Sequence, residues 1–466
     1  MPDYLYENRV SYIYEIKDIH DLDNKGCRFL LFNPFVNYWM PLDDIGVEIY
    51  LKIKELNSMK KVEEFFCNKY EISSKIFRDD SNELIKCFVK RKLLVENVEK
   101  DNWLNNHYEL SNDIMKYPFN DIYISLSDNC NLDCIYCFNK EQRKCRLKNK
   151  NIKYLTTEKI KEVLLEFKSI NGQGVIFTGG EPTLNNDFEE LCVYAHSIGL
   201  NVSFITNGLL LGKLNFDRLF NSLDTFGISF DSIVNSELEE MWNVKNSRLS
   251  DIVLSNLMKV DEWAGENNKI IKINMMPIVS KLNNKSLPKL VEAVTENIKH
   301  CEVQWSMTKY DIINKRDIDE KMNISEQRYI DSVANSLIGL ASSDMNSVLA
   351  YAYGHANKNE PSYKPKVISC APSYFLTNDG SIYPCQGCEK EQYYIGSIWK
   401  INLKDAFETE AFENVKYQII KDNMYKCKEC ELRYTCVAEG RPCVEKIEDN
   451  CREECVKRMF VYAISN

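Results

Sequence analysis

The sequence predicts an α/β fold in which a partial (β/α)6 TIM barrel stands between a winged-helix-like N-terminal domain and a cysteine-rich C-terminal domain. Strand-like and helical runs alternate between residues 122 and 305. Before residue 100, two strand-like runs precede three helical patterns, and beyond about residue 365 the periodicity gives way to short runs punctuated by Gly, Pro and Cys. We therefore expect domains at residues 1–100, 115–345 and 365–466.

The N-terminal strands are predicted from alternating apolar and polar residues, and the helices from apolar residues at helical spacing. The strands are expected at Ser11–Ile16 and Cys27–Phe32. The helices are expected at residues 42–56, at Met59–Tyr70 behind Ser58, and from the Asp80–Glu83 capping pair to Lys90.

The barrel elements follow from six apolar runs separated by helices, an order typical of parallel βα units. The strands are expected at Ile122–Leu126, Gly174–Phe177, Asn201–Ile205, Thr225–Phe230, Ile270–Val279 and Glu302–Trp305. The helices are expected at Thr157–Phe167, Asp187–His196, Asp251–Trp263 and Leu287–Ile298.

Charge and composition exclude several classes of protein. The net charge of the 466 residues is −10, and acidic and basic residues are interspersed with no basic tract expected, which argues against a nucleic-acid partner. The chain contains no run of some eighteen consecutive apolar residues, which a membrane-spanning helix would need. Its first residues lack the basic and then apolar layout of a signal peptide. We expect a cytoplasmic protein that does not bind membranes.

Eighteen cysteines need an explanation in a reducing compartment, where clustered cysteines more often bind metal than form disulfides. Twelve of them fall around residues 130–137 and 370–455. The other six are expected to be inert, and they are Cys27, Cys67, Cys87, Cys145, Cys192 and Cys301.

The sharpest motif is Cys130-Asn-Leu-Asp-Cys134-Ile-Tyr-Cys137-Phe138, directly after the first barrel strand. Three thiolates in a short loop can bind three irons of a cubane and leave the fourth iron open. A structural zinc site normally has four ligands, and no histidine lies near this loop. An iron–sulfur cluster is therefore favoured over zinc.

The C-x3-C-x2-C spacing resembles the signature of the radical S-adenosylmethionine (SAM) superfamily. The resemblance implies that Cys130, Cys134 and Cys137 hold a 4Fe–4S cluster whose open iron binds SAM. A general acid or base is not assigned. The remaining SAM-binding residues implied by the resemblance are Tyr136 near adenine, the glycine-rich motif Gly179, Gly180 and Glu181, Ser229 after the fourth strand, and Arg248.

The C-terminal cysteines resemble the SPASM extension of radical SAM enzymes, which implies two auxiliary 4Fe–4S clusters. In that extension Cys427, Cys430 and Cys436 would hold one cluster, closed by Cys451 or Cys455. Cys370, Cys385 and Cys443 would hold the other, with Cys388 or a substrate group as fourth ligand. A zinc ribbon at residues 427–436 is the alternative.

The position after Cys385 separates this chain from the sulfatase-maturing members of the family, which carry an Asp base there. Here it is Gln386, which cannot act as a base, so sulfatase maturation is disfavoured. Residues 1–100 resemble the leader-recognition element of ribosomal-peptide maturases, which binds a leader by adding it as a strand to a small sheet. A generic winged helix is the alternative.

Together these features predict a radical SAM enzyme that modifies a ribosomal precursor peptide with a leader, by thioether crosslinking. Its other partner would be an electron donor such as flavodoxin or ferredoxin. Carbon–carbon crosslinking or epimerisation of the peptide is the rival reaction. A cluster-bearing redox sensor or binding protein is the alternative from a different class.

Overall fold

The computed structural model describes residues 12–15, 28–33, 38–90, 94, 121–223, 225–310, 320–325, 328–329, 332–333, 336, 374–389 and 391–419. Seven predicted cluster ligands lie outside the described residues, and they are Cys370, Cys427, Cys430, Cys436, Cys443, Cys451 and Cys455. Within the described part, no helix is both long and apolar enough to traverse a lipid bilayer.

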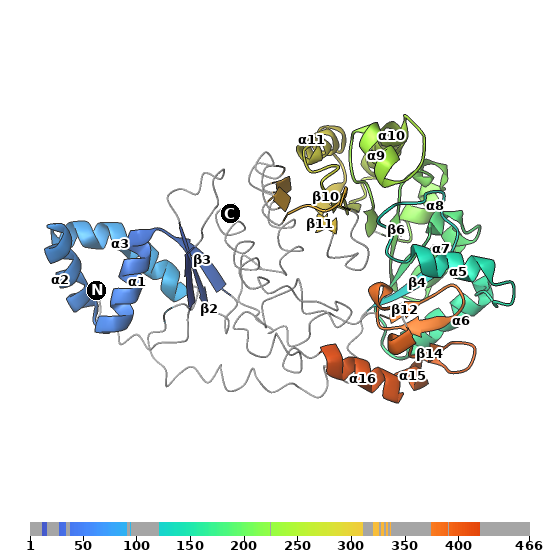
Figure 1. The fold of residues 1–466 in the computed structure, drawn as a ribbon, viewed down its shortest axis with the longest axis horizontal. Helices are drawn as coiled ribbons and strands as arrows, with labels where there is room; N and C mark the ends of the chain where they lie inside the picture. Colours follow the sequence, from blue (N-terminus) through green and yellow to red (C-terminus); the bar gives the residue numbers. More distant parts are fainter. Residues whose placement is uncertain are drawn as a thin grey trace.

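The N-terminal unit combines a three-stranded antiparallel sheet with three helices (Figure 1). Its core includes the fully buried side chains of Tyr50, Phe66 and Phe88. The elements are β1 (Tyr12–Glu15), β2 (Phe29–Asn33), β3 (Tyr38–Leu42), α1 (Asp44–Leu56), α2 (Met59–Tyr70) and α3 (Ser74–Lys90).

Two details of this unit differ from the sequence prediction. Strand β3 was not predicted, because its Trp, Met and Pro do not alternate with polar residues. Helix α3 begins at Ser74 and not after Asp80, since Ser81 is buried inside the helix and donates its hydroxyl to the carbonyl of Phe77 at 2.7 Å. The predicted capping pair is therefore an interior turn of the helix.

The predicted partial barrel is confirmed by six parallel strands in the order β10-β8-β7-β6-β5-β4. These strands are β4 (Asp121–Ser127), β5 (Gly174–Gly179), β6 (Asn201–Thr206), β7 (Thr225–Ile228), β8 (Lys272–Met275) and β10 (Glu302–Trp305). A short parallel pair extends them, formed by β9 (Ile278–Val279) and β11 (Thr308–Lys309).

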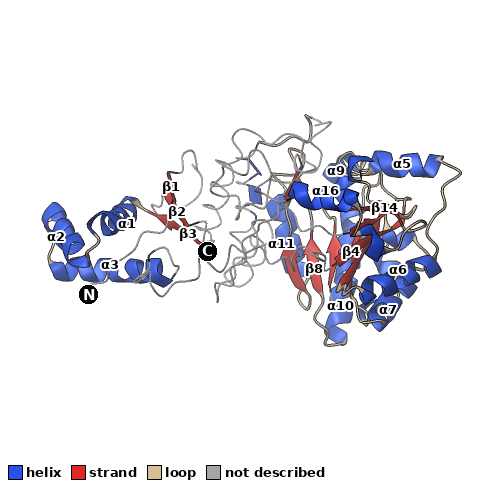
Figure 2. Ribbon diagram, turned by 90° about the horizontal axis from the view of Figure 1, so that it is seen from below, coloured by secondary structure: helices blue, strands red, loops and turns tan. Residues whose placement is uncertain are grey.

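Helices pack around this sheet, and Figure 2 shows α6, α7 and α10 next to strands β4 and β8. The core between the layers is aromatic, with the rings of Phe204 and Phe226 stacked at 5.2 Å. The helices are α5 (Lys140–Lys148), α6 (Thr157–Ser169), α7 (Phe188–Ser197), α8 (Phe216–Phe220), α9 (Asn235–Met241), α10 (Leu249–Glu266) and α11 (Leu287–Asn297).

One predicted strand, Ile270–Val279, is divided into β8 and β9. Pro277 lies between them and has no backbone N–H to donate. The next N–H, of Ile278, is donated to the carboxylate of Asp231 at 2.7 Å instead of to a neighbouring strand. The division therefore places a polar contact inside the barrel.

The C-terminal segment continues the barrel sheet. Strand β12 (Tyr374–Leu376) pairs in parallel with β4, and β13 (Ser381–Tyr383) and β14 (Gly396–Ser397) follow antiparallel. Beyond them lie α15 (Leu403–Ala406) and α16 (Glu410–Ile419), and Phe407 stacks on the buried ring of Tyr374 at 3.9 Å. The segment that carries Cys385 and Cys388 is thereby fixed to the edge of the barrel at β4.

Candidate active site

The loop that carries Cys130, Cys134 and Cys137 leaves the C-terminal end of β4, where barrel enzymes build their sites. Its backbone is held by the end of α9. The N–H of Asp133 donates to the carbonyl of Trp242 at 3.2 Å, and the N–H of Ile135 donates to that of Met241 at 3.0 Å. The three cysteines are half-buried and are not in disulfides.

The three thiols lie close enough to influence one another. Burial raises the pKa of Cys130 to about 11 and raises that of Cys134 well above its usual range, and the neighbouring cysteines raise both pKa values further. Arg143 lies beside them and donates from Nη2 to the Sγ of Cys137 at 3.4 Å. The charge of Arg143 opposes the rise in the pKa of Cys130. Ligation by iron requires thiolates, so a cation beside the loop suits a cluster site.

The fit of this loop to a cluster rests on its donor chemistry. In the described part of the chain, no three His, Cys, Asp or Glu side chains converge as they would on a single metal ion. Three soft thiolates gathered in one loop suit a multi-iron cluster, whose ligands bind different irons and need not meet at one point. The residues present therefore fit a 4Fe–4S cluster.

The end of β5 packs directly against this loop, which explains two glycines of the predicted SAM motif. A Cβ atom on Gly179, whose φ is +135°, would lie 2.5 Å from the carbonyl oxygen of Ser127. A Cβ atom on Gly180 would lie 2.2 Å from the carbonyl oxygen of Asn129. The backbone N–H of Gly180 donates to Ser127 at 2.7 Å. Side chains here would push the two strand ends apart.

Glu181 uses its carboxylate inside the protein. It is 1% exposed, and Oε1 accepts hydrogen bonds from the hydroxyls of Thr183 at 2.6 Å and Thr206 at 2.7 Å. Oε2 accepts the backbone N–H of Asn207 at 2.9 Å. Burial raises the pKa of Glu181, and these hydrogen bonds oppose that rise. The side chain therefore joins the ends of β5 and β6, and its role in SAM binding remains a prediction.

Tyr136 is tied to a buried carboxylate. Its hydroxyl donates to Oδ2 of Asp231, which also accepts the indole N–H of Trp242 at 2.6 Å. Asp231 is fully buried after β7, and burial raises its pKa while its three donors, including the N–H of Ile278, oppose the rise. This carboxylate therefore joins the cysteine loop to α9 and β9. No pattern in the sequence indicates that role of Asp231.

Ser229 and Arg248 remain predictions as SAM ligands. Ser229 lies at the same end of the sheet, where its N–H donates to the carbonyl of Thr206 at 2.9 Å. Arg248 is exposed at the N-terminus of α10. Among the described residues, neither side chain makes a hydrogen bond with the cysteine loop.

Arg146, which no sequence motif singles out, joins the cysteine loop to the segment of Cys385 and Cys388. Its guanidinium donates to both carboxylate oxygens of Asp128, with Nη2 at 2.8 Å from Oδ1, and Nη1 donates to Oε1 of Glu389. Exposed fractions of these three side chains are 9%, 0% and 6%. Glu389 directly follows Cys388, and Asp128 lies two residues before Cys130. The signal was the pair Arg143 and Arg146, one helical turn apart just after the cysteine motif.

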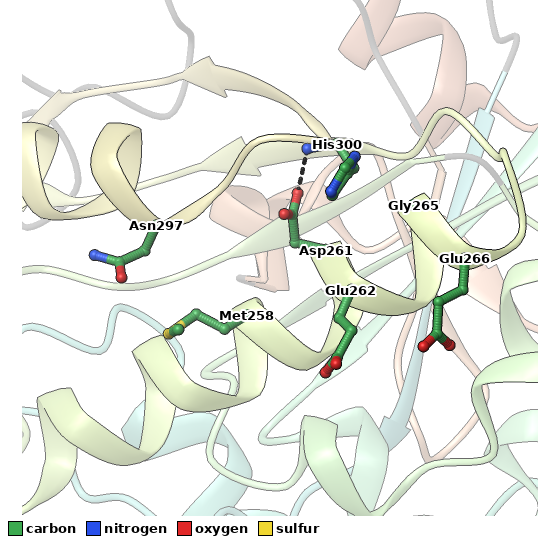
Figure 3. Close-up of a pocket in the computed structure, with 7 residues that line it drawn as sticks. All are labelled: Met258, Asp261, Glu262, Gly265, Glu266, Asn297 and His300. Atoms are coloured by element: carbon green, nitrogen blue, oxygen red, sulfur yellow. Dashed lines mark hydrogen bonds between the residues drawn. The ribbon is translucent and has the colours of Figure 1, made fainter.

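A pocket of about 590 Å³ lies elsewhere, between α10 and the segment before β10 (Figure 3). Its Asp261 accepts the backbone N–H groups of Lys299, His300 and Cys301 at 2.7–3.0 Å. Gly265 lets the His300 ring lie against α10. Because α10 runs opposite to the strands, this pocket lies at their N-terminal ends, away from the cysteine loop. Asp261 therefore has a structural role.

Comparison with known families agrees with this geometry. A model described as the radical SAM superfamily matches residues 124–294, and one described as SPASM, an iron–sulfur cluster-binding domain, matches residues 370–431. The first domain implies a 4Fe–4S cluster and SAM, and the second implies auxiliary iron–sulfur clusters. The predicted C-terminal domain is thereby confirmed.

Individual relatives resemble parts of the chain. An S-adenosylmethionine-dependent nucleotide dehydratase from Selenomonas ruminantium is 33% identical over 174 residues, 36% of this chain and 58% of that protein. PqqA peptide cyclase from Bradyrhizobium diazoefficiens is 26% identical over 172 residues, 37% of this chain and 42% of that protein. The chain thus spans about half the length of the curated relatives it matches.

A solved structure described as native anSMEcpe with bound AdoMet and Kp18Cys peptide has a TM-score of 0.53 and 19% identity. The match covers 74% of this chain and 96% of that chain. At this identity the likeness supports the fold alone.

Proposed function

We propose that this chain, a protein with a radical SAM domain followed by a SPASM domain, modifies a ribosomal precursor peptide. The observation that carries the proposal is the buried Asp128–Arg146–Glu389 bridge. It joins the loop of Cys130, Cys134 and Cys137 to the segment of Cys385 and Cys388. A substrate between the two regions would face both the SAM-binding cluster and an auxiliary cluster.

When bound, the SAM-binding cluster supplies one-electron cleavage of SAM and, from it, abstraction of a substrate hydrogen atom. The protein's own residues hold this chemistry in place. Arg143 supports the Cys137 thiolate, and Asp231 fixes Tyr136 beside the loop. Gly179 and Gly180 let the end of β5 pack against the backbone of Ser127 and Asn129, which holds the cysteine loop next to β5.

Thioether formation is the reaction we favour. It joins a cysteine sulfur of the peptide to an acceptor carbon. The acceptor carbon would lose a hydrogen atom to the 5′-deoxyadenosyl fragment of SAM, the thiol would lose a proton, and the remaining electron would pass to an iron–sulfur cluster, so that SAM is the oxidant. An auxiliary cluster with an open iron would hold the substrate thiolate, and Cys385 is one of its expected ligands. Gln386 stands where sulfatase-maturing enzymes place a base, and its amide cannot accept the proton. Loss of that base favours a different peptide reaction from sulfatase maturation.

The N-terminal unit is the part of the chain that we propose binds the leader of the precursor peptide. Its sheet has the order β1-β2-β3, so β1 and β3 form its two edges among the described strands. A leader strand pairing with such an edge would gain main-chain hydrogen bonds. Two relatives point toward different substrates, since one is a peptide cyclase and the other a nucleotide dehydratase. Their matches cover little more than a third of the chain, so a nucleotide remains the second candidate.

The test is an anaerobic reaction of the reconstituted protein with SAM, dithionite and candidate precursor peptides from short reading frames next to this gene. A thioether removes two hydrogen masses and one alkylatable thiol from the peptide. A carbon–carbon crosslink removes the same mass but leaves every thiol reactive, and epimerisation changes neither. Loaded protein that releases no 5′-deoxyadenosine with or without peptide would be a sensor and would refute the proposal.

Two cysteine variants supply the internal controls. Cys134→Ala removes a ligand of the SAM-binding cluster and should abolish 5′-deoxyadenosine formation. Cys145→Ser changes an exposed cysteine on α5 and should leave activity within twofold of the wild type. Equal activity of Cys134→Ala and the wild type would remove the cluster assignment.

A further inference from the structure

Helix α5 and the segment after it carry an unusual amount of positive charge for an acidic protein. Residues 140–153 contain seven Lys and Arg residues and one Glu, in a chain of net charge −10. This concentration corrects the expectation that the chain has no basic tract. Arg143 and Arg146 point inward and are buried. The five lysines are Lys140, Lys144, Lys148, Lys150 and Lys153.

Much of this charge is not neutralised by the protein. Lys140 and Lys144 share one carboxylate, that of Asp133, at 2.8 and 3.1 Å. Among the described residues, no acidic side chain pairs with Lys148 or Lys150, and both are exposed. With Glu141 and Asp133 counted against the five lysines, the solvent-facing charge here is +3.

Apolar side chains are exposed among these lysines. Phe138, Leu147 and Tyr154 are 38%, 46% and 37% exposed. Lys153 stacks its ammonium on the ring of Trp399 at 3.6 Å, which joins the C-terminal hairpin to the same region. We call these three apolar side chains and the five lysines the basic face. Apolar contacts surrounded by charge are typical of protein docking surfaces.

The basic face lies directly over the cysteine loop. Helix α5 begins three residues after Cys137, and its inward side chain Arg143 reaches the Sγ of that cysteine at 3.4 Å. Leu147 and Lys148 lie on the exposed side of the same helix. A helix with its side chains is about 10–12 Å thick. A protein bound to the basic face would therefore be separated from the cluster ligands by about one helix.

We propose that the basic face docks a small acidic protein that delivers single electrons. The inference rests on the proposed function, because cleavage of SAM needs an electron, and one from outside the chain is required for the first reduction of the cluster and after every cleavage not coupled to product. In the transfer, the donor is oxidised by one electron and the cluster held by the cysteine loop is reduced by one. Encounters of this kind use small interfaces, so charge attraction governs their rate.

The experiment tests whether an acidic electron donor binds the basic face. The probe is purified flavodoxin, a small acidic flavoprotein. The double variant Lys148→Glu with Lys150→Glu reverses two lysines outside the site described above. The control is Lys289→Glu, which reverses an exposed lysine on α11.

Two measurements are made on each protein. The first is the affinity for oxidised flavodoxin by calorimetry, which needs no turnover. The second is 5′-deoxyadenosine formation, driven either by reduced flavodoxin or by dithionite. We expect the double variant to lose tenfold or more in affinity and in flavodoxin-driven rate at low salt. The loss should shrink at 0.5 M salt, and the dithionite-driven rate should not change.

Three outcomes would overturn the proposal. Unchanged flavodoxin affinity in the double variant would show that the donor binds elsewhere. An equal fall in the dithionite-driven rate with peptide would assign the basic face to the substrate. An equal loss of flavodoxin affinity in Lys289→Glu would show that the overall charge of the protein, and not the basic face, sets that affinity. Absence of dithionite-driven cleavage in the wild type would instead refute the proposed function, while the binding measurement would still test the docking surface.

Discussion

Removal of the Arg146 guanidinium should destabilise the barrel strongly, because it leaves two buried carboxylates without their cation. The side chains of Asp128 and Glu389 are 0% and 6% exposed. Breaking a buried ion pair by removing one partner costs about 3–5 kcal/mol. In a unit of this size, 1 kcal/mol shifts the midpoint of thermal unfolding by about 2–4 °C. Arg146→Met should therefore lower the barrel transition by roughly 6–20 °C.

Anaerobic differential scanning calorimetry of the reconstituted protein measures this shift. The matched control is Lys272→Met, which removes an exposed pair with Glu302 at 3.8 Å and should cost less than about 1 kcal/mol. Adding Asp128→Leu and Glu389→Leu to Arg146→Met should reverse most of the fall in the unfolding midpoint, because buried ion pairs can be replaced by apolar side chains. A midpoint of Arg146→Met within 2 °C of the wild type would refute the bridge.

The remaining predictions concern the site and the cysteines outside it. Gly180→Ala should weaken SAM binding at least tenfold in equilibrium dialysis, because its methyl group would lie 2.2 Å from a backbone oxygen of the cysteine loop; unchanged affinity would contradict that packing. Tyr136→Phe should cost about 1–3 kcal/mol of stability in calorimetry by removing a donor to buried Asp231. No loss would show that this hydrogen bond does not hold the loop. Iodoacetamide should alkylate the exposed Cys145 well before Cys301, because burial raises the pKa of Cys301 to about 12. Below that pKa, the alkylation rate of Cys301 should rise about tenfold for each pH unit. Peptide mapping checks both rates, and faster labelling of Cys301 at pH 8 would contradict the prediction.

The periodic part of the fold was predictable because each barrel element repeats a simple pattern over many residues. The six apolar runs contain the six strands of the barrel sheet, although the fifth run is divided at Pro277 into β8 and β9. Helix α6 begins at Thr157 as expected, behind the Thr156 side chain that caps it at 3.2 Å. The third N-terminal helix was misplaced because a capping pattern also occurs inside helices. At Ser81 the hydroxyl bonds back to the preceding turn, and only burial by neighbouring elements decides between the two states.

The cluster ligands were predictable because the short spacing of the cysteines itself indicates a cluster site. The residues that support those ligands could not be predicted. Arg146 and Glu389 are 243 positions apart, and neither belongs to a motif. Their pairing depends on β12 adding to the edge of β4, which no local pattern of three strand residues can predict.

The role of Asp231 could not be predicted from the sequence either. Asp231 follows β7 at the end of the sheet where a ligand is expected, yet the three hydrogen bonds that it accepts all come from the protein itself. A carboxylate so fully bonded is better suited to hold a loop than to exchange a proton with substrate. At this barrel end, the side chains still open to a ligand are therefore to be sought on the cysteine loop and the C-terminal segment. The cysteine loop and the segment of Cys385 and Cys388 are joined there by Arg146.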